Sequence, residues 1–294
     1  PAAQLDAQGL IDAGALSRTA VKRVNILLST FWPGPFTIVL PKNLGVPDLA
    51  TSGLPTVALR MPAHPAAQAL IEAAGSPLAA PSANRFGRIS PTSPEAVFTE
   101  LGDRIEFILD GGQCEIGVES TIINCLPDGS LVLLRPGGTP IADIENAVHT
   151  RVIQSFSRSN RKESAPAAAP GMLASHYSPV TPLYLLGKSF AEVSEKDITA
   201  ILGLFPADVT VGILLFQKEN EAALKRINPF VNRSLISKSL SESGNLAEAS
   251  KHLFSSLRFL DQSQADIIIS EPCPSDEGLG HAIQDRLNRA SVSS

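Results

Sequence analysis

Segments with helical periodicity alternate with short strand-like segments through most of the 294 residues, and this alternation limits the folds open to the chain. Apolar residues recur at helical spacing between residues 8 and 30, and helix-forming composition returns at 65–74 and 94–101. The expected strands are residues 36–40, 56–60, 77–80, 104–109, 120–125 and 130–135. Such alternation is typical of an α/β fold, in which helices cover a sheet.

The regular pattern is interrupted once, from about residue 155 to residue 182, where Ser, Ala and Pro dominate. Beyond this stretch, the expected strands are 183–186, 209–216 and 265–270, and the expected helices are 245–260 and 277–290. A chain of this length exceeds what one hydrophobic core usually supports. We therefore predict a first domain at 1–154, an interdomain linker at 155–182 and a smaller α/β domain at 183–294.

The composition is that of a folded protein, with 44% apolar and 18% charged residues. A net charge of −5 argues against broad adhesion to nucleic acid or anionic membranes, so any tRNA or RNA contact would be local. Apolar runs such as 211–216 are far shorter than the roughly 20 residues that cross a bilayer. We expect a cytoplasmic protein without a membrane segment.

The potential metal ligands are scattered along the sequence. Cys114, Cys125 and Cys273 lack the close pairs of a metal site or a disulfide framework, which favours a reducing compartment. His64 has no partner at metal-ligand spacing. We therefore expect no protein-bound metal.

A loop rich in small and polar residues follows the strand expected at 77–80. Ser82 and Asn84 offer neutral hydrogen-bonding groups there, and Ser90 could contact a phosphate or a ribose. Ligands of open α/β sheets bind beyond the carboxyl ends of strands, which favours a ligand loop at this position. The same composition is also typical of a solvent-facing turn, and the residues alone leave both interpretations open.

Two arginines end strand-like segments. Arg60 would share one strand face with Thr56, and its planar guanidinium suits a carboxylate or a phosphate. Arg135, before a Pro-Gly-Gly turn, could be a second anion ligand. The segment 117–121 brings a glycine, an acid and two hydroxyls to the start of a strand. A surface salt bridge for Arg60 and edge-strand polarity for 117–121 are the alternatives.

The common nucleotide and hydrolase signatures are absent from the sequence. It contains no dinucleotide fingerprint, no phosphate-cradling Walker loop and no Gly-x-Ser-x-Gly elbow. No residue is assignable as a covalent nucleophile or separately as catalytic. The chemistry that fits is positioning and charge stabilisation of a bound phosphate ester by hydroxyls, backbone amides and arginines.

Six short motifs occur in order along the first half of the chain. They are Trp32-Pro33-Gly34-Pro35-Phe36-Thr37, Val57-Ala58-Leu59-Arg60-Met61-Pro62, Ala80-Pro81-Ser82-Ala83-Asn84, Leu109-Asp110-Gly111-Gly112, Gly117-Val118-Glu119-Ser120-Thr121 and Leu134-Arg135-Pro136-Gly137. In order and approximate spacing they resemble the threonylcarbamoyl-AMP synthases, the YrdC-like family. Residues 169–179 and 277–287 are similar to the linker and the end of the accessory domain in its long form.

The resemblance implies a fold and a reaction. The fold is a YrdC-like twisted mixed sheet with flanking helices, followed by a smaller Rossmann-like α/β domain. The enzyme would be a nucleotidyltransferase that joins L-threonine, bicarbonate or CO2, and ATP with Mg²⁺ into threonylcarbamoyl-AMP and pyrophosphate. A partner complex, the tRNA threonylcarbamoyl transferase, would then modify an adenosine of tRNA.

The resemblance also assigns residues to the two substrates. Threonine would be held by Arg60, Ala80 and Ser120, with Arg60 facing its carboxylate. ATP would be contacted by Thr56, Ser82, Asn84, Ser90, Arg135, His176 and Tyr177. The last two would come from the linker and close over the nucleotide, excluding water from a labile intermediate.

The sequence departs from the family at its start. The resemblance implies an opening strand and a lysine-x-arginine motif ahead of Trp32, whereas Lys22-Arg23 lacks the intervening residue and lies too close. Compared with the family, the sequence starts downstream of these features, so we expect the domain at 1–154 to be incomplete at its N-terminus, as in a fragment or a truncated gene product, and to have weak or no synthase activity. The alternatives are a non-catalytic RNA-binding module and a carbamoyl-adenylate enzyme for metal-centre maturation; zinc-finger and acylphosphatase-like modules that accompany the latter are absent here.

Overall fold

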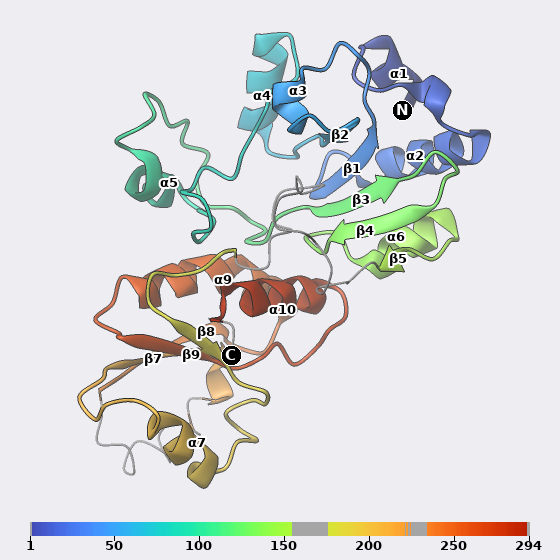
Figure 1. The fold of residues 1–294 in the computed structure, drawn as a ribbon. Coiled ribbons are helices and arrows are strands. Elements are labelled where there is room, and N and C mark those ends of the chain that lie inside the picture. The colour runs from blue at the N-terminus through green and yellow to red at the C-terminus, as the bar shows by residue number, and fades with distance from the viewer. Residues whose placement is uncertain (1, 155–175, 221, 223, 225–233, 293–294) are drawn as a thin grey trace. The chain divides into compact units, whose positions relative to one another are not determined.

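The computed structural model describes residues 2–154, 176–220, 222, 224 and 234–292, and it divides into two compact units (Figure 1). The first unit comprises residues 1–81 and 119–174, and the second comprises 82–118 and 175–294. Most of the linker predicted at 155–182 lies outside the described residues. The predicted domain limits of 1–154 and 183–294 stay a prediction.

The first unit is built on a five-stranded mixed sheet in the order β2-β1-β3-β4-β5. Its strands are β1 (Phe36–Pro41), β2 (Thr56–Leu59), β3 (Thr121–Cys125), β4 (Leu131–Arg135) and β5 (Ile153–Gln154). Its helices are α1 (Ala2–Ala7), α2 (Arg18–Phe31), α3 (Asp48–Thr51), α4 (Pro65–Ala74) and α6 (Ile141–Val148). β1 runs parallel to β3 and antiparallel to β2, and β3 runs antiparallel to β4.

Helix α2 shows how local sequence determines where a helix begins and ends and which face it buries. The Ser17 hydroxyl accepts a hydrogen bond from the Ala20 amide at 3.1 Å, which caps the start of the helix. The helix ends at Phe31, before Trp32 and Pro33, where proline cannot continue it. Its buried residues fall on one face, towards the sheet.

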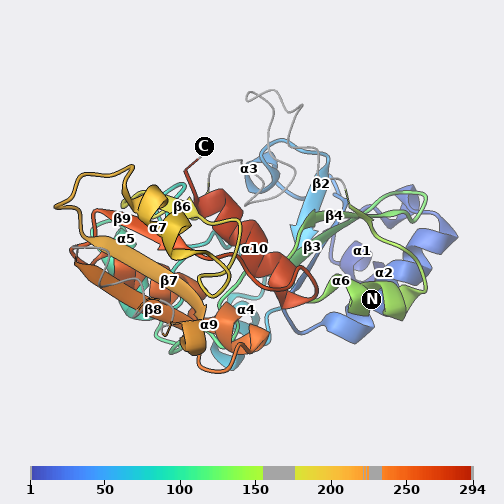
Figure 2. The same cartoon turned by 90° about the horizontal axis from the view of Figure 1, so that it is seen from below.

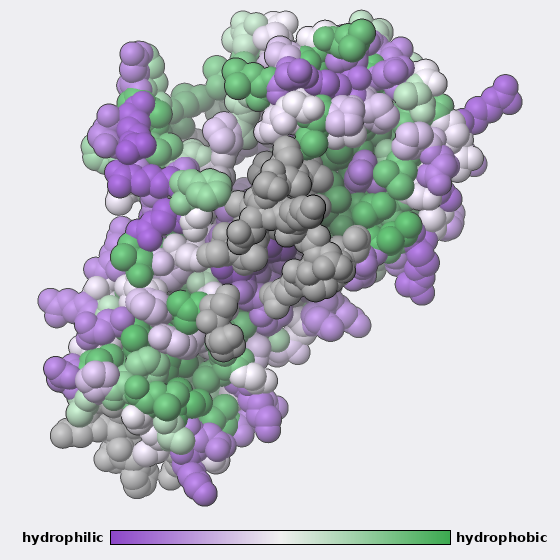
Figure 3. Space-filling view, viewed as in Figure 1, coloured by the Kyte–Doolittle hydropathy of each residue, from purple (hydrophilic) through white to green (hydrophobic). Residues whose placement is uncertain are grey.

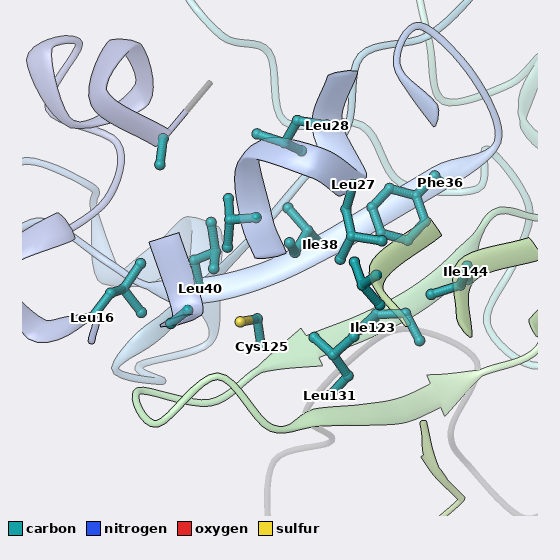
Figure 4. Packing of buried hydrophobic residues seen from close by; sticks show 14 of the residues in the cluster. Leu16, Leu27, Leu28, Phe36, Ile38, Leu40, Ile123, Cys125, Leu131 and Ile144 are labelled. Atoms are coloured by element: carbon teal, nitrogen blue, oxygen red, sulfur yellow. The ribbon is translucent and has the colours of Figure 1, made fainter. Parts of the chain in front are cut away.

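The hydrophobic core of the first unit lies on one face of its sheet (Figure 4). Phe36 and Ile38 of β1 pack there with Leu27 of α2 and Ile144 of α6. Because side chains alternate along a strand, Thr37 and its neighbour Val39 point to the opposite face. Among the described residues, the apolar cluster on that face consists of strand residues alone, namely Val39, Ile122 and Leu134. The two faces of the sheet therefore differ in what covers them.

The second unit contains a four-stranded sheet in the order β6-β9-β7-β8, and every neighbouring pair is parallel. Its strands are β6 (Leu183–Leu185), β7 (Val211–Gln217), β8 (Leu235–Ser241) and β9 (Ile267–Ser270). Its helices are α5 (Pro94–Leu101), α7 (Glu195–Leu202), α9 (Leu246–Asp261) and α10 (Leu279–Ala290). Helices α9 and α10 lie on one side of the sheet and α7 on the other (Figures 1 and 2).

The apolar run at residues 211–216 forms strand β7, whose side chains are buried on both faces of the sheet. Leu214 and Phe216 point into the cluster formed with α9 and α10, whereas Ile213 and Leu215 point into the cluster on the side of α7. A parallel strand covered on both faces has no polar face to show. The predicted α/β fold, with a mixed first sheet and a Rossmann-like second domain, is confirmed.

Two expected strands are not strands in the structure. Residues 77–80 and 104–109 form no ladder with any strand that the structure describes. Their apolar side chains are therefore left at the surface: Phe107 is 88% exposed and Leu109 65% exposed. In the space-filling view, hydrophobic residues reach the surface beside hydrophilic ones (Figure 3). Strand-like composition alone is not enough without a partner to accept and donate the backbone hydrogen bonds.

No helix within the described ranges is both long enough and apolar enough to cross a bilayer.

Candidate functional site

Polar side chains from four of the five strands of the first sheet, β2, β1, β3 and β4, gather at one edge of the sheet, where ends of these strands lie together. In the strand register, Phe36 lies opposite Thr121. Ile38 lies opposite Leu59 in the β1–β2 pair, and Ile122 lies opposite Arg135 in the β3–β4 pair. The starts of β1 and β3 and the ends of β2 and β4 therefore meet at this edge. The polar residues brought there are Thr37, Arg60, Ser120 and Arg135.

Ser120 is the centre of a buried hydrogen-bonded cluster at this edge. Its Oγ lies 2.7 Å from Thr37 Oγ1. The guanidinium of Arg135 donates to the Ser120 hydroxyl at 3.2 Å and to the Ser120 carbonyl oxygen at 3.1 and 3.2 Å. Thr37, Ser120 and Arg135 are 7%, 5% and 7% exposed. Polar groups buried to this degree need such partners, so the cluster holds the strand ends in a fixed geometry.

The turn after β4 packs directly against the segment that starts β3. A side-chain carbon at Gly137 would lie 2.3 Å from the Glu119 carbonyl oxygen, so only glycine permits this approach. Thr121 Oγ1 donates to the Thr139 carbonyl at 2.6 Å and accepts from the Thr139 amide at 3.0 Å. The two motifs that the sequence presented separately, around residues 119–121 and 135–138, are therefore one structural feature.

Arg60 reaches the same edge from β2. Its Nε donates to the Gly34 carbonyl at 2.9 Å, and the Gly34 amide donates to the Met61 carbonyl at 2.9 Å. These bonds tie the turn after α2 to the end of β2. Arg60 is exposed, in contrast to the buried Arg135. The edge thus combines an exposed guanidinium with a buried hydroxyl cluster, a combination suited to a small anionic ligand.

The other two predicted residues of the first unit, Thr56 and Ala80, make none of the hydrogen bonds described for this cluster. Thr56 shares a strand face with Arg60, because residues four positions apart in a strand point to the same side. It lies opposite Pro41, however, at the other end of β2. Ala80 is exposed and lies in an irregular segment.

The predicted loop residues Ser82 and Asn84 belong to the second unit. Ser82 is exposed, and Ala83 between the two has a φ of +55°, a conformation that costs energy for residues other than glycine. Asn84 donates to the Arg85 carbonyl at 2.8 Å and to the Arg88 carbonyl at 3.1 Å. Within the described part of the chain its Oδ1 is buried and accepts no hydrogen bond. This acceptor suits a donor from a ligand or from water.

The predicted residues Ser90, His176 and Tyr177 belong to the second unit, in which the segment before Ser90 pairs with the residue after Tyr177. Ser90 is buried, and the Gly87 carbonyl accepts a hydrogen bond from the Ser178 amide at 2.9 Å. The His176 amide donates to the carbonyl of Arg289 at 3.2 Å.

Tyr177 is a core residue of the second unit. It is 1% exposed, its ring centroid lies 5.4 Å from that of Phe254, and the Arg286 guanidinium lies 5.2 Å from it. The ring would have to leave this packing to act as a lid. Its predicted contact with ATP stays a prediction.

Titratable groups contribute little to these sites. Among the residues described, no three His, Cys, Asp or Glu side chains gather in a way that could hold a metal ion. His64 instead caps α4, where its Nδ1 accepts from the Ala66 amide at 3.2 Å. Burial raises the pKa of Cys125 to about 11, but this thiol lies in the hydrophobic core of the first unit.

Thr37 is a site residue that the sequence did not single out, although it ends the first of the six motifs. The available signal was its position. Thr37 follows Phe36 in an otherwise apolar strand. Because successive side chains of a strand point to opposite faces, and Phe36 faces the core, the Thr37 hydroxyl points away from the core.

Two family models together cover nearly the whole chain. The Sua5, YciO and YrdC model, described as "Telomere recombination", matches residues 8–137. A second model, described as "Threonylcarbamoyl-AMP synthase, C-terminal domain", matches residues 140–292.

Curated relatives named threonylcarbamoyl-AMP synthase match along most of this chain. The Pyrococcus abyssi protein is 36% identical over 277 residues, which is 94% of this chain and 76% of the relative. The Bacillus subtilis protein is 38% identical over 279 residues, covering 94% and 75%. The Schizosaccharomyces pombe protein is 36% identical over 280 residues, covering 90% and 65%.

Similarity extends to a solved structure. The crystal structure of P. abyssi Sua5 complexed with L-threonine superposes with a TM-score of 0.77 at 33% identity, covering 97% of this chain and 77% of that one. The chain therefore belongs to the threonylcarbamoyl-AMP synthase family, in its two-domain form with a YrdC-like first part and a Sua5-type C-terminal domain.

Proposed function

We propose that this protein is an L-threonylcarbamoyladenylate synthase, a nucleotidyltransferase acting on L-threonine, bicarbonate or CO2, and ATP. The observation that carries the proposal is the edge of the first sheet, where the strand register places exposed Arg60 at the same strand ends as the buried cluster of Ser120 and Arg135. The related Sua5 structure is a complex with L-threonine, which supports an amino-acid substrate.

The substrate amino acid would be held through its polar groups. The Arg60 guanidinium, fixed through Nε to Gly34, would pair with the threonine carboxylate. The Ser120 hydroxyl would contact a second polar group of the ligand. Ala80 has only backbone polar groups to offer, so we assign it a backbone contact. Holding the carboxylate and a second group fixes the orientation of the amine.

ATP would be contacted by Arg135 and Thr56 of the first unit. The assignments of Ser82, Asn84, Ser90, His176 and Tyr177 to ATP stay predictions, supported at Asn84 by its buried acceptor. Mg²⁺ would arrive with the triphosphate, since it usually keeps several waters and takes few protein ligands.

The reaction needs orientation rather than a protein nucleophile. The neutral threonine amine attacks the carbon of CO2 and releases a proton to solvent, or attacks the carbon of bicarbonate with loss of water, and either route forms a carbamate. A carbamate oxygen then attacks the α-phosphorus of ATP, the bond to the bridging oxygen breaks and pyrophosphate leaves. Arginines and backbone amides stabilise the negative charge on the phosphates in this step.

The product is a mixed anhydride that water destroys, so an acceptor must consume it promptly. From the resemblance we infer that the acceptor is a tRNA adenosine, reached through the tRNA threonylcarbamoyl transferase complex in the cytoplasm. Local contact with tRNA belongs to the same proposal.

The test is product formation from defined substrates. The full chain is incubated with ATP, Mg²⁺, bicarbonate and L-threonine, pyrophosphate is measured, and the adenylate is identified by mass. We expect the adduct to require all three substrates and to be lost in Arg60→Ala but kept in Arg151→Ala, an exposed arginine of the same unit. Pyrophosphate release at the same rate with and without L-threonine would overturn the proposal. Steeply salt-dependent RNA binding without ATP turnover would favour the RNA-binding alternative.

The rate is a separate matter from the identity of the product. The expectation of weak turnover by these residues stays a prediction. Fast turnover would contradict that expectation and leave the proposed function intact.

A further inference from the structure

The hydrogen-bond capacity of the Ser120 hydroxyl is nearly used up inside the protein. A serine hydroxyl can donate one hydrogen bond and accept two. A guanidinium can only donate, so the contact from Arg135 at 3.2 Å occupies one acceptor position of Ser120 Oγ. What remains is one acceptor position and the proton of Ser120 itself.

The contact with Thr37 determines whether Ser120 uses its remaining acceptor position or its proton within the protein. Its Oγ1 lies 2.7 Å from Ser120 Oγ, and either hydroxyl could donate. If Ser120 donated, the proton of Thr37 would be buried with no acceptor among the residues that the structure describes. If Thr37 donates, the proton left over is that of Ser120, and a ligand oxygen at these strand ends that accepts it satisfies both hydroxyls. An unsatisfied buried donor is costly, so the second arrangement is the stable one when a ligand oxygen is bound at Ser120.

We propose that Thr37 is a positioning residue that makes Ser120 a hydrogen-bond donor to bound L-threonine. The inference rests on the proposed function, because it takes L-threonine as the ligand of Ser120. With both acceptor positions filled from within the protein, Ser120 recognises an oxygen of the amino acid and not its ammonium group. The cluster thereby fixes which way round the substrate lies.

The strand geometry holds Thr37 in this role. Its neighbours Phe36 and Ile38 are anchored in the core, and its backbone lies opposite Ile122 of β3. A β-branched side chain has few χ1 rotamers available, so the hydroxyl and the methyl group of Thr37 keep their places.

Calorimetric titration of the full chain with L-threonine tests the inference. Thr37→Val keeps the shape and removes the hydroxyl, and we expect affinity to fall on the order of threefold to tenfold. Thr37→Ser keeps the hydroxyl and should bind like the unmodified protein. Thr51→Val is the matched control, a buried threonine of α3 whose hydroxyl contacts Lys42 and backbone carbonyls.

A double-mutant cycle separates positioning from general destabilisation. If Thr37 acts through Ser120, Thr37→Val should have no further effect on threonine affinity in a Ser120→Ala background. A merely structural role for Thr37 would weaken binding equally in both backgrounds, and that result would overturn the inference. Should Thr37→Val fail to fold in a thermal melt, Thr37→Ser and Thr37→Ala provide a second pair that differs by the hydroxyl alone.

The outcomes distinguish the two levels of the proposal. If the unmodified chain does not bind L-threonine, the proposed function fails and the inference falls with it. If the unmodified chain binds and Thr37→Val binds equally well, only the role of Thr37 is overturned.

Discussion

The guanidinium of Arg135 donates to the backbone carbonyl of Ser120 at 3.1 Å and to its hydroxyl at 3.2 Å. These residues were assigned to different substrates, Arg135 to ATP and Ser120 to threonine. The contact means that the two assignments share one rigid cluster. A change at either residue should therefore affect the binding of both substrates.

Arg135→Lys tests this sharing. Lysine keeps the charge but lacks the planar fork, so it cannot reproduce the paired contacts to Ser120. We expect the affinity for both ATP and L-threonine to fall roughly tenfold, measured by separate titrations. Arg151→Lys, exposed and paired with Glu145, should change neither affinity. A loss confined to ATP would contradict the shared cluster.

Arg60 is expected to read the carboxylate of threonine. Hydrogen bonds to charged groups contribute about 1.5–3 kcal/mol, so Arg60→Gln should weaken L-threonine binding roughly 10- to 100-fold. L-threoninamide, which lacks the negative charge, provides the sharper comparison. The unmodified protein should prefer the acid to the amide, and Arg60→Gln should lose that preference. An unchanged preference would remove Arg60 from the carboxylate site.

Glu271, which follows β9, links the loop after β6 to the end of β7 and to the segment that follows β7. Its buried carboxylate accepts from the Phe190 amide at 2.9 Å, from the Phe216 amide, and from the Asn220 side chain at 2.7 and 2.9 Å. Glu271→Leu leaves these donors without their acceptor and should lower the free energy of unfolding by about 3 kcal/mol or more. Chemical denaturation measures this, with exposed Glu115→Leu as the control, and equal stability of the two variants would contradict the account.

Cys125 should be inert in the folded protein, because burial raises the pKa of its thiol from 9.0 to about 11. Iodoacetamide at neutral pH should alkylate exposed Cys114 and spare Cys125. The unfolded chain ionises near pH 9 and the folded chain only near pH 11. The stability contributed by the neutral thiol is therefore full below pH 9 and is lost as pH rises towards about 11. Equal labelling of the two cysteines in the native protein would refute this.

Local sequence signals predicted most helices and strands. Helices α4 and α5 occur where their composition placed them, because proline at the first turn and capping residues such as His64 and Ser93 mark their starts. The apolar run of β7 likewise predicted a buried strand. The polar strand β8 was missed, since four of its seven residues are serine or lysine and only its end is buried.

The sequence alone could not show which strands pair with each other. Residues 77–80 and 104–109 have strand composition, but a strand exists only where another strand completes its hydrogen bonds, which no local pattern reveals. The meeting of Ser120 with Thr37, 83 positions away, likewise depends on the parallel pairing of β1 and β3. The motifs indicated the residues, and the register of the strands joined them.

The central claim is that the edge around Ser120 binds L-threonine, and calorimetric titration of the full chain measures this most directly. The account predicts saturable binding of L-threonine that is weakened in Arg60→Gln and Ser120→Ala and unaffected in Arg151→Ala. Absence of binding by the unmodified chain at millimolar ligand, or binding that Arg60→Gln and Ser120→Ala leave unchanged, would contradict it.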